Sequence, residues 1–347
     1  MHTLFITTPL EKEHVEKVRA VAPDKAAVVF HPELLPPIRY VADHGGAPFT
    51  RTPEQQRLWL ECLGKADILF DFPPLAPDSP VFAELAPKVR WVQTTSTGVG
   101  QHVHRLGLQD SDLLVTTARG VHGGPLAEFV MLGLLAHFRG LRHLEAEQKA
   151  HHWTRYCGDE MAGKTVALIG AGDLARATAL LAKAFDMTTE AVTRHPEKVR
   201  SHGHMFDGIY PTTKLHEVLG RADAVVVTAP HTPETENLID AAAFGAMKRG
   251  IAFVNIARGQ IVDELTLIEC LRDGRIGFAA LDVALVEPLP SHSPLWDMPN
   301  VLISPHSAST VFRENERITD IFCRNLRLYV DGRIDEMQNI LDKRKMY

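Results

Sequence analysis

The sequence predicts an α/β protein that contains two doubly wound parallel sheets. Short apolar runs alternate along the chain with amphipathic segments of helical length. These runs lack the polar alternation of a half-exposed strand, so we expect helices to cover both faces of each sheet. A chain of 347 residues that is 45% hydrophobic is long enough for two compact domains, each with its own core.

The first third of the chain carries the first series of alternating elements. Apolar runs of strand length are separated there by segments with helical periodicity, a pattern typical of a covered parallel sheet. The expected strands are 3–8, 66–72, 91–95 and 113–117, and the expected helices are 11–20 and 53–63.

A long apolar helix is predicted over residues 126–138. It has too few polar positions for an ordinary surface helix. Such a helix is either deeply buried or packed against another subunit. We favour the second alternative, and the sequence therefore predicts a homodimer.

A polar stretch, 146–163, precedes the second series of alternating elements. Six strands with helices between them fit a complete Rossmann-type dinucleotide-binding fold. The expected strands are 165–169, 189–193, 224–228, 252–256, 277–283 and 301–304; the expected helices are 174–185, 264–272 and, past Thr310, 312–330.

A glycine-rich loop follows the first strand of this second series and opens a helix. Gly170 allows the tight turn, and Gly172 lets the backbone approach a pyrophosphate at the helix N-terminus. Ala175 stands at the third glycine position, where only helix–strand packing matters. Glycine turns occur at many strand–helix junctions, but the strand–turn–helix setting favours cofactor binding. The expected contacts are Gly170, Ala171, Gly172, Asp173 and Leu174.

The end of the next strand bears on the choice of cofactor. An NAD site would place Asp or Glu there to hold the ribose 2′-hydroxyl, whereas this strand ends in Thr193 and Arg194. Arg194 is suited to a 2′-phosphate, although it would also fit an ordinary solvated loop. We therefore predict NADP (NADPH) as the preferred cofactor, with NAD as the alternative.

Composition argues against several other classes of protein. The net charge of −6 lacks the basic footprint of a nucleic-acid binder, and the four cysteines form no CxxC pair that would indicate a zinc site or a disulfide framework. The N-terminus has no signal-peptide pattern, and no stretch approaches the ~20 apolar residues that span a bilayer. We expect a cytoplasmic protein with free thiols, no metal, and neither nucleic-acid nor membrane partners.

Three polar residues each follow an apolar strand of the second series. Arg258 can grip a carboxylate through a bidentate fork, His306 can exchange a proton near neutral pH, and Glu287 can orient and charge that imidazole. Each alone has an ordinary explanation as a surface turn, a loop start or a packing residue. Because the carboxyl ends of parallel strands meet at one edge of the sheet, we expect these side chains to converge there.

Together these motifs resemble the D-isomer-specific 2-hydroxyacid dehydrogenase family, which includes glyoxylate and hydroxypyruvate reductases. The resemblance extends over about residues 91–310, whereas the first 90 residues match only in overall pattern. It rests on Ala127-Glu128-Phe129, 170–175, 230–235, 254–259, 281–283, 287–290, 299–301 and Pro305-His306.

The resemblance implies roles for these residues. Arg258 would hold the substrate carboxylate and polarise the C2 carbonyl, His306 would protonate the carbonyl oxygen, and Glu287 would support His306. Asp282 would contact the nicotinamide carboxamide, and Pro230 and Ala257 would line the nicotinamide ring.

The turn from Ser96 to Gly100 matches the carboxylate-binding loop of the family. Thr97, Gly98 and Val99 would there bind substrate through successive backbone N–H groups, although a plain glycine turn is the alternative. Family members often carry an acidic residue where this chain has Gly100.

We therefore expect residues 1–122 and 310–347 to form a flavodoxin-like substrate-binding domain, and residues 123–309 to form the cofactor domain, with a cleft between them. The expected reaction is NAD(P)H-dependent reduction of a small 2-oxo acid to its D-2-hydroxy acid. Two alternatives remain open: an NAD-linked relative that acts on phosphoglycerate or formate, and a dinucleotide-sensing binding protein on the same scaffold.

Overall fold

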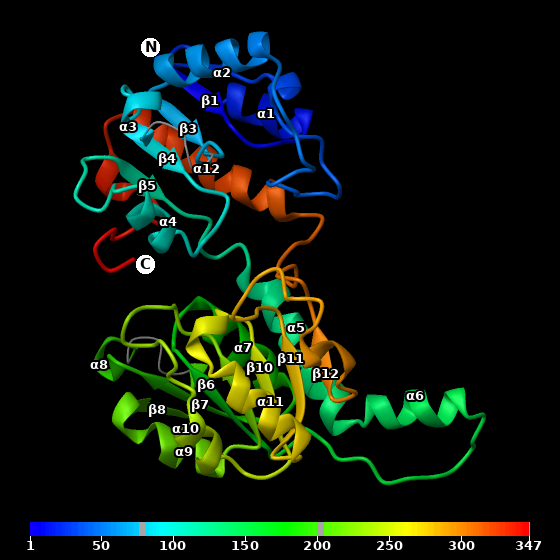
Figure 1. The fold of residues 1–347 in the computed structure, drawn as a ribbon. Coiled ribbons are helices and arrows are strands. Elements are labelled where there is room, and N and C mark those ends of the chain that lie inside the picture. The colour runs from blue at the N-terminus through cyan, green and yellow to red at the C-terminus, as the bar shows by residue number, and fades with distance from the viewer. Residues whose placement is uncertain (76–80, 200–204, 347) are drawn as a thin grey trace. The chain divides into compact units, whose positions relative to one another are not determined.

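The computed structural model describes residues 1–75, 81–199 and 205–346. The chain divides into two compact units. Unit 1 combines the N-terminal segment up to His122 with the C-terminal segment from Thr310, and unit 2 comprises Gly123–Ser309. Each unit is a parallel sheet flanked by helices (Figure 1).

Unit 1 contains a five-stranded parallel sheet with the order β2-β1-β3-β4-β5. This is the flavodoxin-like strand order. The strands are β1 (His2–Ile6), β2 (Ala26–Val29), β3 (Ile68–Phe70), β4 (Trp91–Gln93) and β5 (Leu114–Thr116). Sequence patterning missed only β2, a four-residue edge strand that is mostly half-buried and therefore lacks a strong apolar signal.

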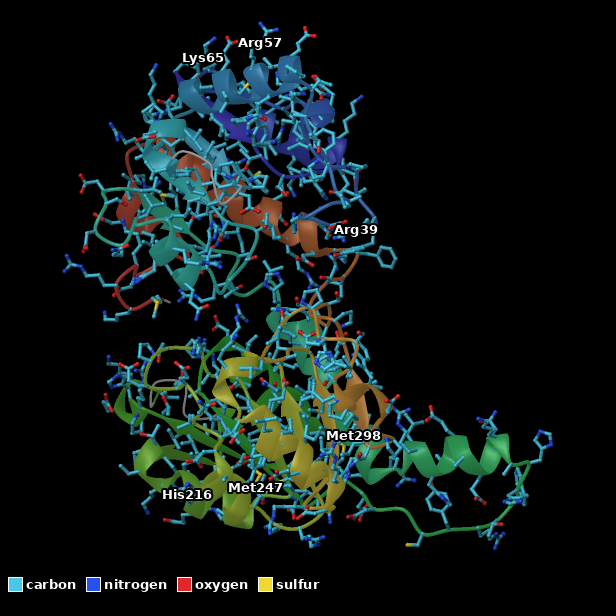
Figure 2. All side chains as sticks on the ribbon, viewed as in Figure 1. Arg39, Arg57, Lys65, His216, Met247 and Met298 are labelled. Carbon is cyan, nitrogen blue, oxygen red and sulfur yellow. The ribbon has the colours of Figure 1, made fainter. Side chains whose placement is uncertain are left out.

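Helices pack on both faces of this sheet. One core cluster lies under α2 (Pro53–Lys65), α3 (Phe82–Leu85) and α4 (Gly100–Arg105), and the other lies under α1 (Lys12–Arg19) and α12 (Glu314–Val330). Local sequence sets the start of α2, because Thr52 and Gln55 form a reciprocal capping box and Pro53 occupies the first turn. Arg57 and Lys65 project from the outer side of α2 (Figure 2). Two short 3₁₀ turns, η1 (Pro32–Leu34) and η6 (Ile334–Glu336), complete the unit.

Unit 2 contains a seven-stranded parallel sheet with the order β12-β11-β10-β9-β6-β7-β8. The strands are β6 (Thr165–Ile169), β7 (Thr188–Thr193), β8 (Gly208–Pro211), β9 (Ala224–Val227), β10 (Ile251–Asn255), β11 (Ile276–Leu281) and β12 (Val301–Ile303). The order is that of a Rossmann fold with one added strand, and its switch point lies between β6 and β9. Patterning predicted six strands and missed β8, an edge strand that begins with glycine and ends with proline.

The helices of unit 2 also cover both faces of the sheet. Cluster residues place α5 (Gly123–Phe138) and α7 (Asp173–Ala184) on one face, and α9 (Leu215–Arg221), α10 (Ala241–Ala246) and α11 (Glu264–Arg272) on the other. The remaining short elements are α8 (Pro196–Val199), η3 (Thr212–Lys214), η4 (Gly259–Ile261) and η5 (Pro294–Asp297). The two covered parallel sheets confirm the predicted fold class.

The apolar helix α5 is buried largely within its own unit. Ten of its sixteen residues are buried, and it packs on α7, β10 and β11. Gly133 permits this contact, because a Cβ there would lie 2.7 Å from the Cβ of Ala280. Deep burial, the alternative that we ranked second, therefore explains most of its composition, while Leu132 remains half exposed.

The segment that follows α5 projects from unit 2 (Figure 1). It begins with α6 (Leu141–Lys149), which has no buried residue, and continues to Trp153, whose side chain is fully exposed. Sequence patterning identified only a polar stretch here. Among the described residues, no helix combines the length and apolar character needed to cross a membrane.

Candidate active site

The predicted site residues of unit 2 lie along one edge of its sheet. The strands order them at their carboxyl ends: Arg194 after β7, the glycine loop after β6, Pro230 after β9, Arg258 after β10, Asp282 after β11 and His306 after β12. This is the edge at which doubly wound sheets bind ligands. Topology therefore brings together residues that span more than a hundred positions of the chain.

The glycine loop lies at the switch point between β6 and β9. Gly170 has φ of 118°, and a Cβ at this position would lie 2.8 Å from Thr228 Oγ1 and 2.9 Å from the Ala229 backbone nitrogen. Gly172 is the N-cap of α7, and a Cβ there would meet nothing within 4 Å. The loop thus combines a turn that only glycine tolerates with open space above the first backbone N–H groups of a twelve-residue helix.

The remaining loop residues take different positions. Ala171 and Ala175 are buried, and Leu174 is half-buried. Asp173 opens α7 and forms an ion pair with Arg176. The buried alanines pack in the core beneath α7, and the ion pair lies within the first turn of that helix.

Arg194 follows Thr193, the last residue of β7. Its guanidinium Nη1 lies 3.2 Å from Glu234 Oε2 in the loop after β9. Arg194 lowers the pKa of Glu234, although hydrogen bonds from Thr232 and from the backbone contribute more. Arg194, which we predict to bind a 2′-phosphate, is therefore already paired with a carboxylate of the protein.

The turn that carries Arg258 is fixed by a buried amide. Asn255 accepts from the Ala257 backbone N–H at 3.0 Å and donates to the Arg258 carbonyl at 3.1 Å. The next position requires glycine, because a Cβ on Gly259 would lie 2.0 Å from the Ala284 carbonyl oxygen. Burial lowers the pKa of Arg258, whereas the charges of Glu287 and Asp282 raise it. Arg258 thus occupies a partly desolvated position in which a charged partner interacts more strongly.

Glu287 and His306 form a hydrogen-bonded pair. His306 Nδ1 lies 2.7 Å from Glu287 Oε2, and Glu287 Oε1 accepts from the Ala284 backbone N–H at 3.1 Å. Burial raises the pKa of Glu287, but the contacts with His306 and Ala284 and the charge of Arg258 outweigh it, so that pKa lies below its ordinary value. The pair holds the ring by Nδ1 and leaves Nε2 as the nitrogen that can exchange a proton with a bound molecule.

Asp282 organises the loop that carries His306. Its Oδ1 accepts from Ser304 Oγ at 2.7 Å and from the backbone N–H groups of Ser307 and Ala308 at 2.9 Å. The His306 backbone N–H donates to the Asp282 carbonyl at 2.8 Å, and His306 adopts a left-handed φ of 53°. A left-handed histidine persists only where its surroundings over-determine the backbone, and the contacts of Asp282 provide that constraint.

The predicted substrate loop belongs to unit 1. Thr97 and Gly98 are exposed between β4 and α4, and Val99 is buried as the residue that precedes α4. Gly100 has a direct explanation: a Cβ there would lie 2.2 Å from the Met346 carbonyl oxygen, so the acidic residue common in the resembled family would collide with the C-terminal tail.

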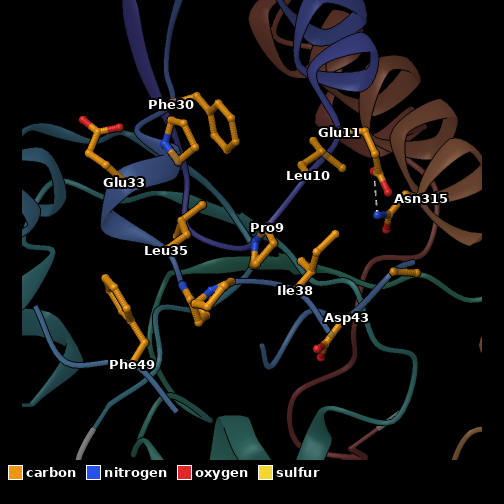
Figure 3. Close-up of a pocket in the computed structure, with 14 residues that line it drawn as sticks. Pro9, Leu10, Glu11, Phe30, Glu33, Leu35, Ile38, Asp43, Phe49 and Asn315 are labelled. Atoms are coloured by element: carbon orange, nitrogen blue, oxygen red, sulfur yellow. Dashed lines mark hydrogen bonds between the residues drawn. The ribbon is translucent and has the colours of Figure 1, made fainter. Parts of the chain in front are cut away.

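A cavity of about 450 Å³ opens in unit 1 beside the loop that follows β2 (Figure 3). Its walls are mainly apolar, and its labelled polar residues include Glu11, which accepts a hydrogen bond from Asn315 at 2.8 Å. None of the predicted site residues lines this cavity. In the described part of the chain, no group of three or more histidine, cysteine or acidic residues could hold a metal ion.

The two sheets and the glycine loop at the switch point define a dinucleotide-binding α/β protein. Residues 131–308, just over half of the chain, match the family model described as the D-isomer specific 2-hydroxyacid dehydrogenase, NAD binding domain. The chain belongs to the D-isomer-specific 2-hydroxyacid dehydrogenase family, which confirms the resemblance seen in its motifs.

Individual relatives differ in their named substrates. D-3-phosphoglycerate dehydrogenase of Mycobacterium leprae is 32% identical over 293 residues, which are 81% of this chain and 52% of that protein. This chain therefore spans about half the length of that relative. (S)-sulfolactate dehydrogenase of Chromohalobacter salexigens is 34% identical over 221 residues, 63% of this chain and 71% of the relative. The solved NADPH-dependent glyoxylate/hydroxypyruvate reductase of Sinorhizobium meliloti, in complex with NADP and sulfate, covers both chains fully, with 25% identity and a TM-score of 0.77.

Sequence reasoning missed the residues that hold the site in shape. Asn255 and Ser304 were unassigned, and the loop contacts of Asp282 were not foreseen. A polar residue at the end of an otherwise apolar strand was the available signal for Asn255, because a buried amide requires partners.

Proposed function

We propose that this protein reduces a small 2-oxo acid of the glyoxylate or hydroxypyruvate type to the corresponding D-2-hydroxy acid, with NADPH as the preferred cofactor. The observation that carries the proposal is the Glu287–His306 pair, 2.7 Å apart, at an edge of the sheet that also carries Arg258. This set supplies a carboxylate anchor and a proton donor in one place.

Arg258 binds the carboxylate of the substrate in this proposal. A guanidinium offers two parallel N–H donors that match the two oxygens of a carboxylate, and partial desolvation strengthens that contact. Its charge also polarises the C2 carbonyl. Asn255 and Gly259 fix the backbone on either side, so that the arginine is held before substrate arrives.

His306 donates the proton that the reduced carbonyl oxygen requires. Glu287 stabilises the imidazolium and fixes its orientation through Nδ1, so that Nε2 faces the substrate oxygen. A positioned proton donor of this kind contributes typically ~10²–10⁴-fold in rate. Because the pKa of Glu287 is lowered, the glutamate remains a carboxylate into mildly acidic solution.

The glycine loop and the ends of β7, β9 and β10 would hold the dinucleotide. The fit rests on Gly170 and Gly172, which combine a turn closed to side chains with open space at the start of α7. When bound, NADPH supplies the hydride for C2. The contacts proposed for it are Gly170, Ala171, Gly172, Asp173, Leu174, Thr193, Arg194, Pro230, Ala257 and Asp282.

The preference for NADPH rests on Arg194. Strand β7 itself ends without a carboxylate, and Arg194 is the cation that follows it; the carboxylate beside Arg194 is Glu234, from the loop after β9. Its ion pair with Glu234 lies at the surface, where such pairs contribute only ~0–1 kcal/mol, so a 2′-phosphate can replace Glu234 at little cost.

Three further features belong to this proposal. The loop of Thr97, Gly98 and Val99 contributes N–H groups to the substrate carboxylate, and residues 1–122 with 310–347 form the substrate-binding domain. The protein acts in the cytoplasm as a homodimer; exposed Leu132 and Trp153 support self-association.

The test is oxidation of NADPH and of NADH by the purified protein over a panel of 2-oxo acids. The panel includes glyoxylate, hydroxypyruvate, 3-phosphohydroxypyruvate and 3-sulfopyruvate, with saturation kinetics for each. We expect the highest kcat/KM for glyoxylate or hydroxypyruvate with NADPH. Absence of turnover with every acid would reject the proposed reaction. A higher kcat/KM for 3-phosphohydroxypyruvate or 3-sulfopyruvate would reject glyoxylate and hydroxypyruvate as the substrate class.

A further inference from the structure

A chain of polar side chains in unit 1 connects the proposed substrate loop to a buried glutamate. Thr97 Oγ1 lies 3.0 Å from His122 Nδ1, and His122 Nε2 lies 3.3 Å from Glu314 Oε1. On the other side of Glu314, His44 Nε2 lies 3.8 Å from the same oxygen, and Thr8 Oγ1 lies 3.3 Å from His44 Nδ1. Two histidines distant in sequence thus flank one carboxylate, and each of them contacts a threonine on its other side.

The carboxylate and the two histidines of this chain of contacts are largely shielded from solvent. Glu314 is 5% exposed, and its Oε2 has no hydrogen-bond partner among the residues that the structure describes. His122 and His44 are mostly buried, whereas Thr97 is exposed. A buried carboxylate is costly unless hydrogen-bonded groups offset its desolvation, so Glu314 constrains the imidazole that faces it.

The hydrogen-bond inventory of this chain determines what Thr97 can offer a ligand. A carboxylate only accepts, so the nitrogen of His122 that faces Glu314 carries its proton. If Nδ1 of His122 is unprotonated, the Thr97 hydroxyl donates its single proton to it, and Thr97 can then only accept a hydrogen bond from a ligand. If Nδ1 is protonated, the imidazolium donates to Thr97, and the hydroxyl proton is free to bind an anion.

We propose that His122, held by Glu314, is a positioning residue that turns the Thr97 hydroxyl into a hydrogen-bond donor for the carboxylate of the substrate. The inference rests on the proposed function, because it takes Thr97 as part of the substrate loop. It adds a side-chain contact to a loop for which only backbone N–H groups were proposed. The imidazolium form of His122 is the form that binds the acid.

The charged and titratable groups around His122 come from several elements. Glu314 faces it from the start of α12, and Arg317, one turn further, donates to the Val121 carbonyl at 3.5 Å. His44 lies on the other side of Glu314. Arg119 precedes His122 by three residues in the same segment. Glu314 is the acid in direct contact with His122.

The experiment is a double-mutant cycle of Thr97→Val and His122→Gln, read by KM and kcat for the best 2-oxo acid. Gln reaches the Nε2 position and keeps the contact with Glu314, but it loses the atom that faces Thr97. We expect each variant to raise KM about tenfold, the usual scale for one charge-assisted hydrogen bond, with kcat within about twofold. The double variant should show no further rise, because both changes remove the same interaction.

Two matched variants separate positioning from a structural role. His122→Asn keeps a donor near the Nδ1 position and should restore KM toward the wild-type value, as should Thr97→Ser through its retained hydroxyl. Additive effects in the cycle, or equal KM values in His122→Gln and wild type, would overturn the inference.

Binding of oxamate to the NADPH-loaded protein, measured by calorimetry, separates this inference from the proposed function. An active wild type whose variants all bind oxamate equally rejects the role of His122 alone. A wild type that binds oxamate without turnover rejects the proposed reaction, and the cycle is then read from binding constants. A wild type that neither binds oxamate nor turns over 2-oxo acids rejects both.

Discussion

The two units carry polar residues at the carboxyl edges of similar parallel sheets, but they hold them in different ways. In unit 2, Asn255 and Asp282 fasten the turns after β10 and β12 through short contacts, most of them to the backbone. In unit 1, the contacts run between side chains of distant segments, as in Thr95 Oγ1 to Asp71 Oδ2 at 2.6 Å and His122 to Glu314. The contacts of Asn255 and Asp282 thus hold loop backbone in place, whereas these unit 1 contacts join one side chain to another.

The proposed function gives this difference a use. Arg258 and His306 of unit 2 are proposed to act on the carboxylate and the carbonyl oxygen that every 2-oxo acid carries, so one geometry serves them all. The Thr97 side chain of unit 1 is proposed to meet the same carboxylate, but it contacts His122, a side chain that a single substitution can change. The comparison can be tested by substitutions in each unit.

The largest effect is expected from His306→Ala in unit 2. Removal of the proton donor should lower kcat/KM by ~10²–10⁴-fold while NADPH still binds. His216→Ala is the matched control, because His216 is an exposed histidine of the same unit on α9 (Figure 2). Steady-state kinetics and cofactor fluorescence provide the readouts, and equal activity of His306→Ala and His216→Ala would remove His306 from the mechanism.

Glu287→Gln should have a smaller effect with a characteristic pH dependence. We expect kcat to fall about ten- to a hundredfold, because the proton donor remains but loses its charged support. The variant should also lose the fall in activity that protonation of Glu287 causes in acidic solution, because an amide does not titrate. The pKa of Glu287 is lowered in the folded protein, so in the wild type its stabilising contribution is lost only as pH falls through that lowered value. A pH–rate profile of unchanged shape would show that the 2.7 Å contact is without catalytic effect.

Arg194→Ala tests the cofactor end of the same edge. We expect KM for NADPH to rise about tenfold, because one charged contact to the 2′-phosphate is lost, while KM for NADH changes little. Glu234→Gln is the companion variant. It releases Arg194 from its 3.2 Å ion pair and should leave KM for NADPH equal or lower. If both cofactors respond equally to the loss of Arg194, the arginine is an ordinary loop residue.

The difference between the two units also explains which site residues could be predicted from the sequence. Each group of the unit 2 edge follows its own apolar strand within a few residues, so Arg258, Glu287 and His306 could be read as short local motifs. The unit 1 network joins Thr8, His44, Thr97, His122 and Glu314, which no local spacing connects. The edge strands β2 and β8 escaped for a related reason, since a half-exposed strand of four residues gives too weak an apolar pattern.

A last and smallest effect concerns Gly100, the position at which this chain departs from the resembled family. In Gly100→Ala, the new Cβ would lie 2.2 Å from the Met346 carbonyl oxygen, so the C-terminal tail must shift. We expect a loss of about 1–3 kcal/mol in the free energy of unfolding, the usual cost of overpacking. Gly64→Ala is the control, because its Cβ would meet nothing within 4 Å inside α2 and should stabilise slightly. Removal of the residues after Arg344 should relieve the collision in Gly100→Ala, and a Gly100→Ala variant as stable as the wild type in chemical denaturation would show that the tail does not pack there in solution.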